Sequence, residues 1–129
     1  MPYAAPLDEM RFAIDTVAAL DGLVEPDLAD AILAEAARFA AAELDPLNQI
    51  ADRTGSVLEN GVVRTPPGFR EAYRRYVEGG WMGLACDPVH GGQGLPLSLA
   101  APVVEMWNSA CMSWALCPLL NLGDRKSVV

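Results

Sequence analysis

The chain has 129 residues, a length typical of one domain, and hydrophobic residues make up 52% of it. Its formal net charge of −8 argues against nucleic-acid binding, which needs clustered Lys and Arg side chains. The three cysteines include no CxxC pair, which argues against a disulfide framework or a zinc site.

The amino-terminal segment predicts a helix over residues 7–20. Its apolar residues recur at helical spacing and form one stripe: Leu7, Met10, Ile14, Val17 and Leu20. The segment lacks the basic flank and apolar core of a signal peptide. No apolar run in the sequence approaches the roughly 20 residues of a membrane span, so we expect a cytoplasmic protein.

A second helix is predicted to begin at Pro26, because proline suits the first helical position and Asp27 favours the positive end of the helix dipole. Its predicted buried face consists of Leu28, Ile32, Ala36, Phe39 and Ala40. Asp45–Pro46 is expected to bend or end this helix, since the residue before proline avoids the α region.

The amino-acid composition changes between residues 52 and 67, where turn-forming residues are frequent. Val57–Leu58 and Val62–Val63 flank Asn60–Gly61, a pattern that predicts a short hairpin with a type I′ turn. Two such strands do not form a core alone, so we expect the hairpin to lie against the helices.

A third helix is predicted to follow Pro67–Gly68 and to stop at Gly79–Gly80. One face of it carries Phe69, Tyr73, Tyr76 and Val77, and the other faces carry Arg70, Glu71, Arg74, Arg75 and Glu78. A loop containing Asp87–Pro88 and the glycines from 91 to 94 comes next.

Pro96 is predicted to start a fourth helix, along which Leu99, Val103, Met106 and Trp107 align. Pro102 is expected to kink this helix or to delay its start. We expect a break near Asn108–Ser109 and a last apolar helix to about Leu122. The elements together predict an all-α, up-and-down helical bundle with one short β-hairpin.

The loop HGGQGLP, residues 90–96, allows two interpretations. Glycine at a helix start exposes backbone N–H groups that can bind phosphate, but the spacing is not that of a P-loop or a dinucleotide-binding loop. A tight connection in which only glycine fits is the favoured interpretation.

The remaining chemically reactive residues are interpreted as structural. His90 is the only histidine and has no partners for a nucleophilic or metal site. Cys86, Cys111 and Cys117 lie in apolar sequence, which favours core thiols over nucleophiles. The carboxylates of the second helix are predicted to lie on a solvated face: Glu35, Glu43 and Asp45.

Three tryptophans stand out in so short a chain: Trp81, Trp107 and Trp114. Core packing is favoured for them. Residues 114–119 also alternate bulk and space, as a pocket for an acyl chain requires, and the pattern alone does not choose between core and pocket.

Four blocks in order carry a resemblance to a known family: ILAEAARFAAAELDPLNQIAD, LENGVVRTPPGFREAYRRYVEGGWMGL, DPVHGGQGLP and EMWNSACMSWALCPLL. They resemble the amino-terminal helical domain of FAD-dependent acyl-CoA dehydrogenases. The leader YAAPLDEMRFAIDTV is similar to the extra first helix of a longer subgroup, which includes 3-methylmercaptopropionyl-CoA dehydrogenases. Val89 stands where the family's loop often has glutamate.

The resemblance implies an oxidoreductase of fatty acid metabolism that oxidises the α,β bond of an acyl-CoA thioester. In that family a glutamate removes the α proton, FAD accepts hydride, and an electron-transfer flavoprotein takes the electrons. The full enzyme is usually a homo-oligomer. The resemblance places Trp114, Ala115, Pro118 and Leu119 near the acyl-binding wall, and it implies no catalytic residue within this chain.

The resemblance also divides the chain. Residues 1–33 are expected to hold an extension helix and the start of the second helix, 34–123 the family's helical domain, and 124–129 an atypical tail. The ending GDRKSVV does not continue as the family does, so we expect an incomplete gene, a premature stop or a frameshifted end, and no activity of the chain alone. The alternatives are a free-standing helical binding or subunit-interaction module, or a relative that is an acyl-CoA oxidase or flavin monooxygenase.

Overall fold

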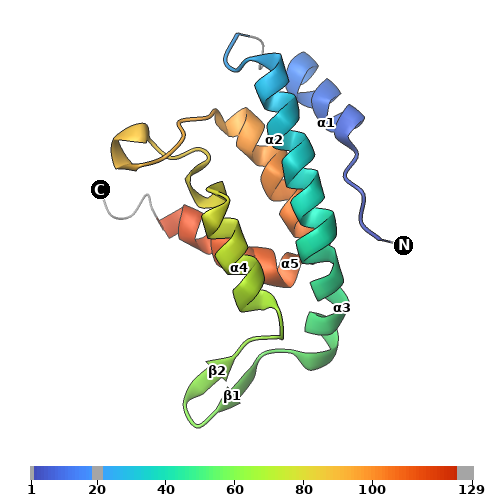
Figure 1. Ribbon diagram of the computed structural model, residues 1–129, viewed down its shortest axis with the longest axis vertical. Helices are drawn as coiled ribbons and strands as arrows, with labels where there is room; N and C mark the ends of the chain where they lie inside the picture. The colour runs from blue at the N-terminus through green and yellow to red at the C-terminus, as the bar shows by residue number, and fades with distance from the viewer. Residues whose placement is uncertain (1, 19–21, 125–129) are drawn as a thin grey trace.

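The computed structural model describes residues 2–18 and 22–124, with side chains as far as Asn121. The described chain is a helical bundle with one antiparallel hairpin, as the sequence predicted (Figure 1). Its helices are α1 (Leu7–Phe12), α2 (Pro26–Phe39), α3 (Asp45–Thr54), α4 (Phe69–Glu78) and α5 (Leu97–Asp124), and its strands are β1 (Val57–Glu59) and β2 (Val62–Arg64). None of the helices in the described ranges combines the length and apolar character needed to cross a membrane.

The amino-terminal helix α1 continues into a π-helical turn, Ala13–Val17. Met10 and Ile14 are buried as predicted. Val17 was predicted to share their stripe but is 80% exposed, because the wider π turn changes the helical phase after Phe12. Leu20, the last predicted member of the stripe, lies outside the described residues.

Helix α2 begins at Pro26 as predicted, but its buried stripe differs in part from the prediction. Ala36, Phe39 and Ala40 are buried, whereas Leu28 is exposed and Ile32 is half-buried. Ala29 and Leu33 lie inside instead. The helix is rich in alanine and so offers two adjacent stripes, and the stripe with the smaller side chains allows α5 to pack more closely.

The chain stays helical across the predicted bend. A π-helical turn, Ala40–Leu44, connects α2 directly to α3, which begins at Asp45. Proline has no N–H group and its ring clashes with the carbonyl four residues earlier in an α-helix. The wider π turn relieves that clash and lets the helix bend past Pro46 instead of ending.

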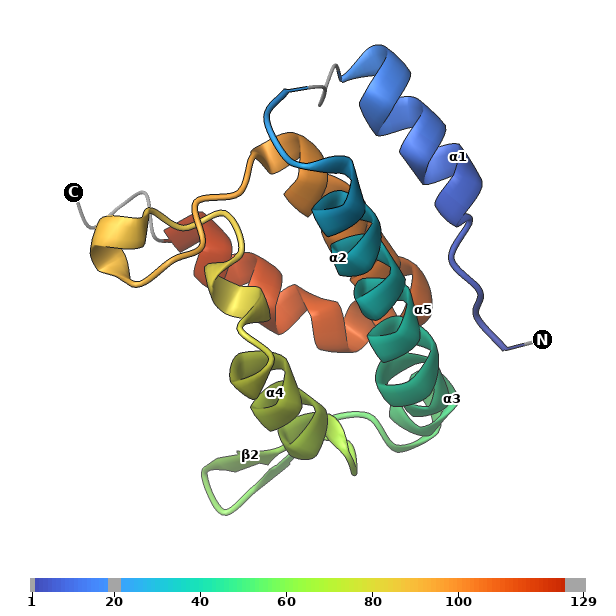
Figure 2. The same ribbon diagram turned by 45° about the horizontal axis from the view of Figure 1, so that its top comes forward.

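The hairpin forms at the predicted place. Asn60 and Gly61 have φ values of 51° and 78°, as a type I′ turn requires, and Leu58 pairs with Val63. The prediction that it lies against the helices is wrong, because all six strand residues are exposed. Its two three-residue strands project beyond the ends of α3 and α4 (Figures 1 and 2).

Helix α4 ends at the predicted glycine pair, where Gly80 has a φ of 76°. Tyr76 is buried and Phe69 and Tyr73 are half-buried, as their predicted face requires. Val77 was assigned to the same face but is 45% exposed. The inner face of this short helix includes Ala72 instead, which is buried.

Helix α5 buries Leu99, Val103, Met106 and Trp107, as predicted, and Pro102 lies inside it. The break comes at Cys111, with φ −156° and ψ 85°, and not at Asn108–Ser109. The Asn108 side chain donates to the Val104 carbonyl at 2.8 Å, so its hydrogen-bonding group is satisfied inside the helix that it was expected to end.

Aromatic side chains form the centre of the core. The Phe39 and Trp107 rings lie 5.1 Å apart, Trp81 and Trp107 lie 5.3 Å apart, and Tyr76 and Trp114 lie 5.5 Å apart. The ring planes of each pair are close to perpendicular, the edge-to-face arrangement that aromatic pairs favour. The core interpretation is confirmed for Trp107 and Trp114, which are buried, while Trp81 is half-buried at the edge of the core. These contacts join α2, α4 and α5.

Candidate functional site

A groove of about 360 Å³ lies between α4 and the second half of α5, at the base of the hairpin. Its walls combine aromatic rings with a few polar groups: Ser56, Thr65, Phe69, Arg70, Tyr73, Ser113, Trp114 and Cys117. We call it the α4–α5 groove. An apolar concavity with few polar groups is typical of small-molecule sites.

The floor of this groove is held in place by hydrogen bonds between its two helices. The Trp114 indole Nε1 donates to the Phe69 carbonyl at 3.2 Å, and the Asn121 amide donates to the Tyr73 hydroxyl at 3.1 Å. The Tyr76 ring packs edge-on against Trp114. The indole is therefore fixed from two sides, and the groove has a rigid aromatic floor.

The four residues that the sequence assigned to an acyl wall do not all face this groove. Trp114 lines it, Ala115 and Pro118 are buried in the bundle, and Leu119 is 40% exposed. Sequence reasoning missed Ser113 on the same helix and the α4 side of the groove. Finding them requires knowing that α4 crosses the second half of α5, which the local pattern does not reveal.

The cysteines differ in their surroundings. Cys111 is buried as predicted, and Cys86 is half-buried, with its thiol donating to the Met82 carbonyl at 3.3 Å. The core interpretation is wrong for Cys117, which is exposed and lines the α4–α5 groove. The helical break at Cys111 turns the last part of α5 so that Cys117 faces the groove and not the core.

A second groove, of about 400 Å³, lies between the turn after α4 and the first half of α5. Its lining is mostly apolar, and Tyr76 is its one titratable side chain: Tyr76, Trp81, Met82, Leu84, Ala85, Leu97, Ala100, Ala101, Val103, Val104 and Trp107. Burial raises the pKa of Tyr76 to about 12, so this hydroxyl stays protonated at neutral pH. The second groove therefore offers packing and no acid–base chemistry.

The glycine-rich loop uses its backbone donors within the chain. The N–H groups of Gly92, Gln93 and Gly94 donate to the carbonyls of Asp87, Gly83 and Cys86 at 3.1, 2.8 and 2.8 Å. A Cβ on Gly92 would overlap the Cys86 backbone. These N–H groups are not available to cradle a phosphate, which favours the tight-connection interpretation over ligand binding.

His90 is exposed on the 3₁₀ turn Pro88–His90 and lines neither groove. The Asp87 carboxylate caps this turn by accepting from the Val89 N–H at 2.8 Å. Within residues 2–18 and 22–124, no group of three or more His, Cys, Asp or Glu side chains is arranged to hold a metal ion.

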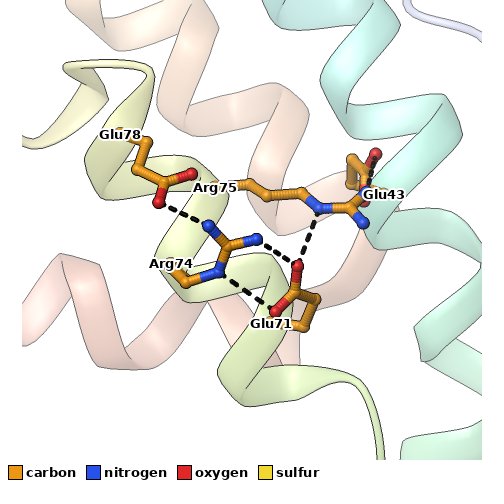
Figure 3. Close-up of polar contacts among 5 residues, drawn as sticks. All are labelled: Glu43, Glu71, Arg74, Arg75 and Glu78. Atoms are coloured by element: carbon orange, nitrogen blue, oxygen red, sulfur yellow. Dashed lines mark hydrogen bonds and ion pairs between the residues drawn. The ribbon is translucent and has the colours of Figure 1, made fainter.

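An ion-pair network covers the outer face of α4 (Figure 3). Glu71 accepts from Arg74 and Arg75, and its bonds with Arg74 hold the pKa of the Glu71 carboxyl at about 2. Arg75 also binds both carboxylate oxygens of Glu43, at 2.6 and 2.7 Å. Glu43 thus ties the π turn to α4, and it is half-buried where a solvated position was expected.

The grooves do not by themselves make a site for FAD. The diphosphate of this cofactor needs cationic side chains or free backbone N–H groups. Arg70 is the one cationic residue in the lining of the α4–α5 groove, and Arg74 and Arg75 are paired with carboxylates. A flavin therefore needs residues beyond those in these grooves.

Comparison with known proteins identifies the domain. Residues 26–123 match the family described as acyl-CoA dehydrogenase, N-terminal domain. The chain is also 42% identical, over 131 aligned residues, to 3-methylmercaptopropionyl-CoA dehydrogenase of Ruegeria pomeroyi. That alignment covers 95% of this chain and 22% of the relative, so the chain spans about a fifth of the relative's length.

Proposed function

The chain belongs to the acyl-CoA dehydrogenase family, and from this membership we propose that it serves as the amino-terminal helical domain of a flavoprotein that oxidises the α,β bond of an acyl-CoA thioester. The match over residues 26–123 carries this proposal. The name of the Ruegeria pomeroyi relative suggests 3-methylmercaptopropionyl-CoA, or another short acyl-CoA, as the substrate to test first.

We assign the α4–α5 groove to the acyl-binding wall of this enzyme. Trp114 supplies the rigid aromatic surface, and Phe69 and Tyr73 face it from α4. Ala115 and Pro118 are buried on the same helix as Trp114, whereas Leu119 lies on the opposite side of α5 and is left out of this wall. The side chains of the wall would exclude water from the acyl chain and orient it, and no residue of this chain is assigned to proton or hydride transfer.

The chain alone is proposed to be inactive, because its grooves do not complete a flavin site. FAD, an electron-transfer flavoprotein and a homo-oligomeric assembly belong to the proposal for the longer protein, as does a cytoplasmic location. FAD would supply the redox chemistry when bound.

The proposal is tested by comparing the chain with a chimera. The isolated chain is expected to retain no FAD and to show no acyl-CoA-dependent reduction of an electron-acceptor dye. A chimera with this chain in place of the matched region of the Ruegeria pomeroyi relative is expected to bind FAD and to oxidise 3-methylmercaptopropionyl-CoA. A folded chimera that binds FAD but oxidises no acyl-CoA would contradict the proposed function.

The groove assignment is tested in the same chimera by Cys117→Phe, which places a ring in the α4–α5 groove at an exposed position. We expect KM to rise more for long acyl chains than for short ones, with kcat for the shortest substrate little changed. Leu28→Phe, at an exposed apolar position on α2 that does not line the α4–α5 groove, is the matched control. An equal effect of both variants on every chain length would contradict the assignment.

A free-standing helical binding module is the second candidate. The continuous aromatic core favours it, because one closed core can stabilise a domain of this size. A cooperative thermal transition without binding of a hydrophobic dye would support the module. Strong dye binding by the folded chain would support a domain that normally packs against other domains.

A further inference from the structure

The second half of α5 is apolar on two opposite sides. One side faces the bundle and includes Trp114, Ala115 and Pro118. The other side carries four large apolar residues that are 40–69% exposed: Met112, Leu116, Leu119 and Leu120. We call these four residues the outer α5 stripe.

The stripe follows helical geometry. Its members stand at positions i, i+4, i+7 and i+8, which places them within an arc of roughly 100° on the helix surface. Trp114 and Pro118 lie on the opposite side of the same helix. A helix that is apolar all round normally has protein on every side, and scattered exposed leucines do not keep such spacing.

Nothing in the described ranges covers this stripe. The helical break at Cys111 turns the second half of α5 away from α2, and it then runs past α4 (Figures 1 and 2). On its α3 side, the stripe borders a hollow lined by Asn48, Ala51, Asp52, Met112, Ser113 and Leu116. An apolar centre beside polar groups resembles the core and rim of a protein interface.

We infer that the outer α5 stripe is the docking surface for the part of an acyl-CoA dehydrogenase polypeptide that lies outside the region matched by this chain. This inference rests on the proposed function. The length of the relative supports this occupant: the chain aligns over 95% of its own residues, but these make up 22% of the relative. A polypeptide of that length carries enough further structure to bury a contiguous apolar surface.

The test uses the full chain and a tagged Ruegeria pomeroyi relative from which the matched region is deleted. Calorimetry measures their association without substrate or added FAD. The variant Met112→Gln/Leu116→Gln/Leu120→Gln is expected to bind at least about a hundredfold more weakly, because each substitution removes one buried apolar side chain. The matched control Phe12→Gln/Leu28→Gln/Val89→Gln changes three exposed apolar residues elsewhere and is expected to bind like the wild type.

A second measurement decides the matter if the deleted relative does not fold. In the chimera described above, the stripe variant should lower Tm, whereas in the isolated chain it should leave Tm unchanged or raise it, because there the stripe is solvated. Equal effects of the stripe and control variants in the chimera would overturn the inference. So would a concentration-dependent dimer of the isolated chain that the stripe variant abolishes, since a second copy would then be the occupant. Stripe-dependent binding in an inactive assembly would leave the inference standing and contradict the proposed function.

Discussion

Replacing Gly92 with alanine tests whether the glycine-rich loop is a tight structural connection. A Cβ at this position would come well under 3.0 Å from the carbonyl group and Cβ of Cys86. The same Cys86 carbonyl accepts from the Gly94 N–H at 2.8 Å, and the Gly92 N–H donates to Asp87 at 3.1 Å. The added methyl group therefore has to move backbone that is held by hydrogen bonds on both sides.

The cost follows from these contacts. Overpacking costs about 1–3 kcal/mol, and two disturbed backbone hydrogen bonds add about 1 kcal/mol each, so Gly92→Ala should lower the free energy of unfolding by about 3–5 kcal/mol. Gly91→Ala is the matched control. Gly91 has a φ of 80° and open space around its Cα, so alanine there meets only backbone strain of about 1–2 kcal/mol. The loss of unfolded-state entropy is common to both variants and cancels in the comparison.

Urea unfolding followed by tryptophan fluorescence measures both variants, because Trp107 and Trp114 are buried in the core. Gly92→Ala should shift the midpoint to lower urea by clearly more than Gly91→Ala does, with the m-value unchanged. Equal shifts would refute the reasoning, since backbone strain alone would then account for both. Stability unchanged in Gly92→Ala, with loss of binding to a phosphate-bearing ligand, would restore the ligand interpretation of the loop.

Three further predictions follow from the core and the α4 surface. Trp114→Phe should lower the free energy of unfolding by about 1–2 kcal/mol, because the Phe69 carbonyl loses its indole donor. Trp114→Ala should lower it by about 3–5 kcal/mol, because the packing of the ring is lost as well. Urea unfolding measures both variants, and equal costs would mean that packing contributes little. The pKa of Tyr76 is raised to about 12, so its stabilising contribution is complete below pH 10 and falls as the pH rises towards 12. The Tm of the wild type should therefore decline over that pH range, and the Tm of Tyr76→Phe should decline less. An equal decline in both proteins would contradict the burial argument. The pKa of Glu71 is lowered from 4.5 to about 2, so its stabilising contribution is present above pH 4.5 and is lost as the pH falls towards 2. The difference in unfolding free energy between wild type and Glu71→Gln should therefore shrink over that pH range, and it should be smaller in 1 M salt. A difference that does not depend on pH would count against the ion pair.

The elements whose signals are local were predicted well from the sequence. Pro26 and Gly79–Gly80 act on their own backbone, and Asn60–Gly61 needs only positive φ values. The errors arose where tertiary packing decides between local alternatives. An alanine-rich helix such as α2 presents two adjacent stripes, and contact with α5 selects the one that contains Leu33.

The candidate site was predicted less completely than the fold. The residue pattern left both a core and a pocket open for Trp114, and only the family resemblance placed an acyl-binding wall there; Trp114 lines the α4–α5 groove. The partners Phe69 and Tyr73 lie more than forty residues earlier in the chain. Only the crossing of two helices brings them together, and that crossing depends on the break at Cys111, which no strong helix breaker in the sequence announces.

The π turn between α2 and α3 has a consequence for how one long helical arm keeps contact with the core. Its inner residues form two consecutive sets with the same spacing, first Ala29, Leu33, Ala36 and Ala40, and then Ala40, Leu44, Leu47 and Ala51. This is an eleven-residue repeat, about 3.67 residues per turn, slightly more than an ideal α-helix provides. A uniform α-helix would gradually rotate these residues away from α5. The extra width of a single π turn corrects that rotation, so alanine and leucine stay turned inward along the whole arm.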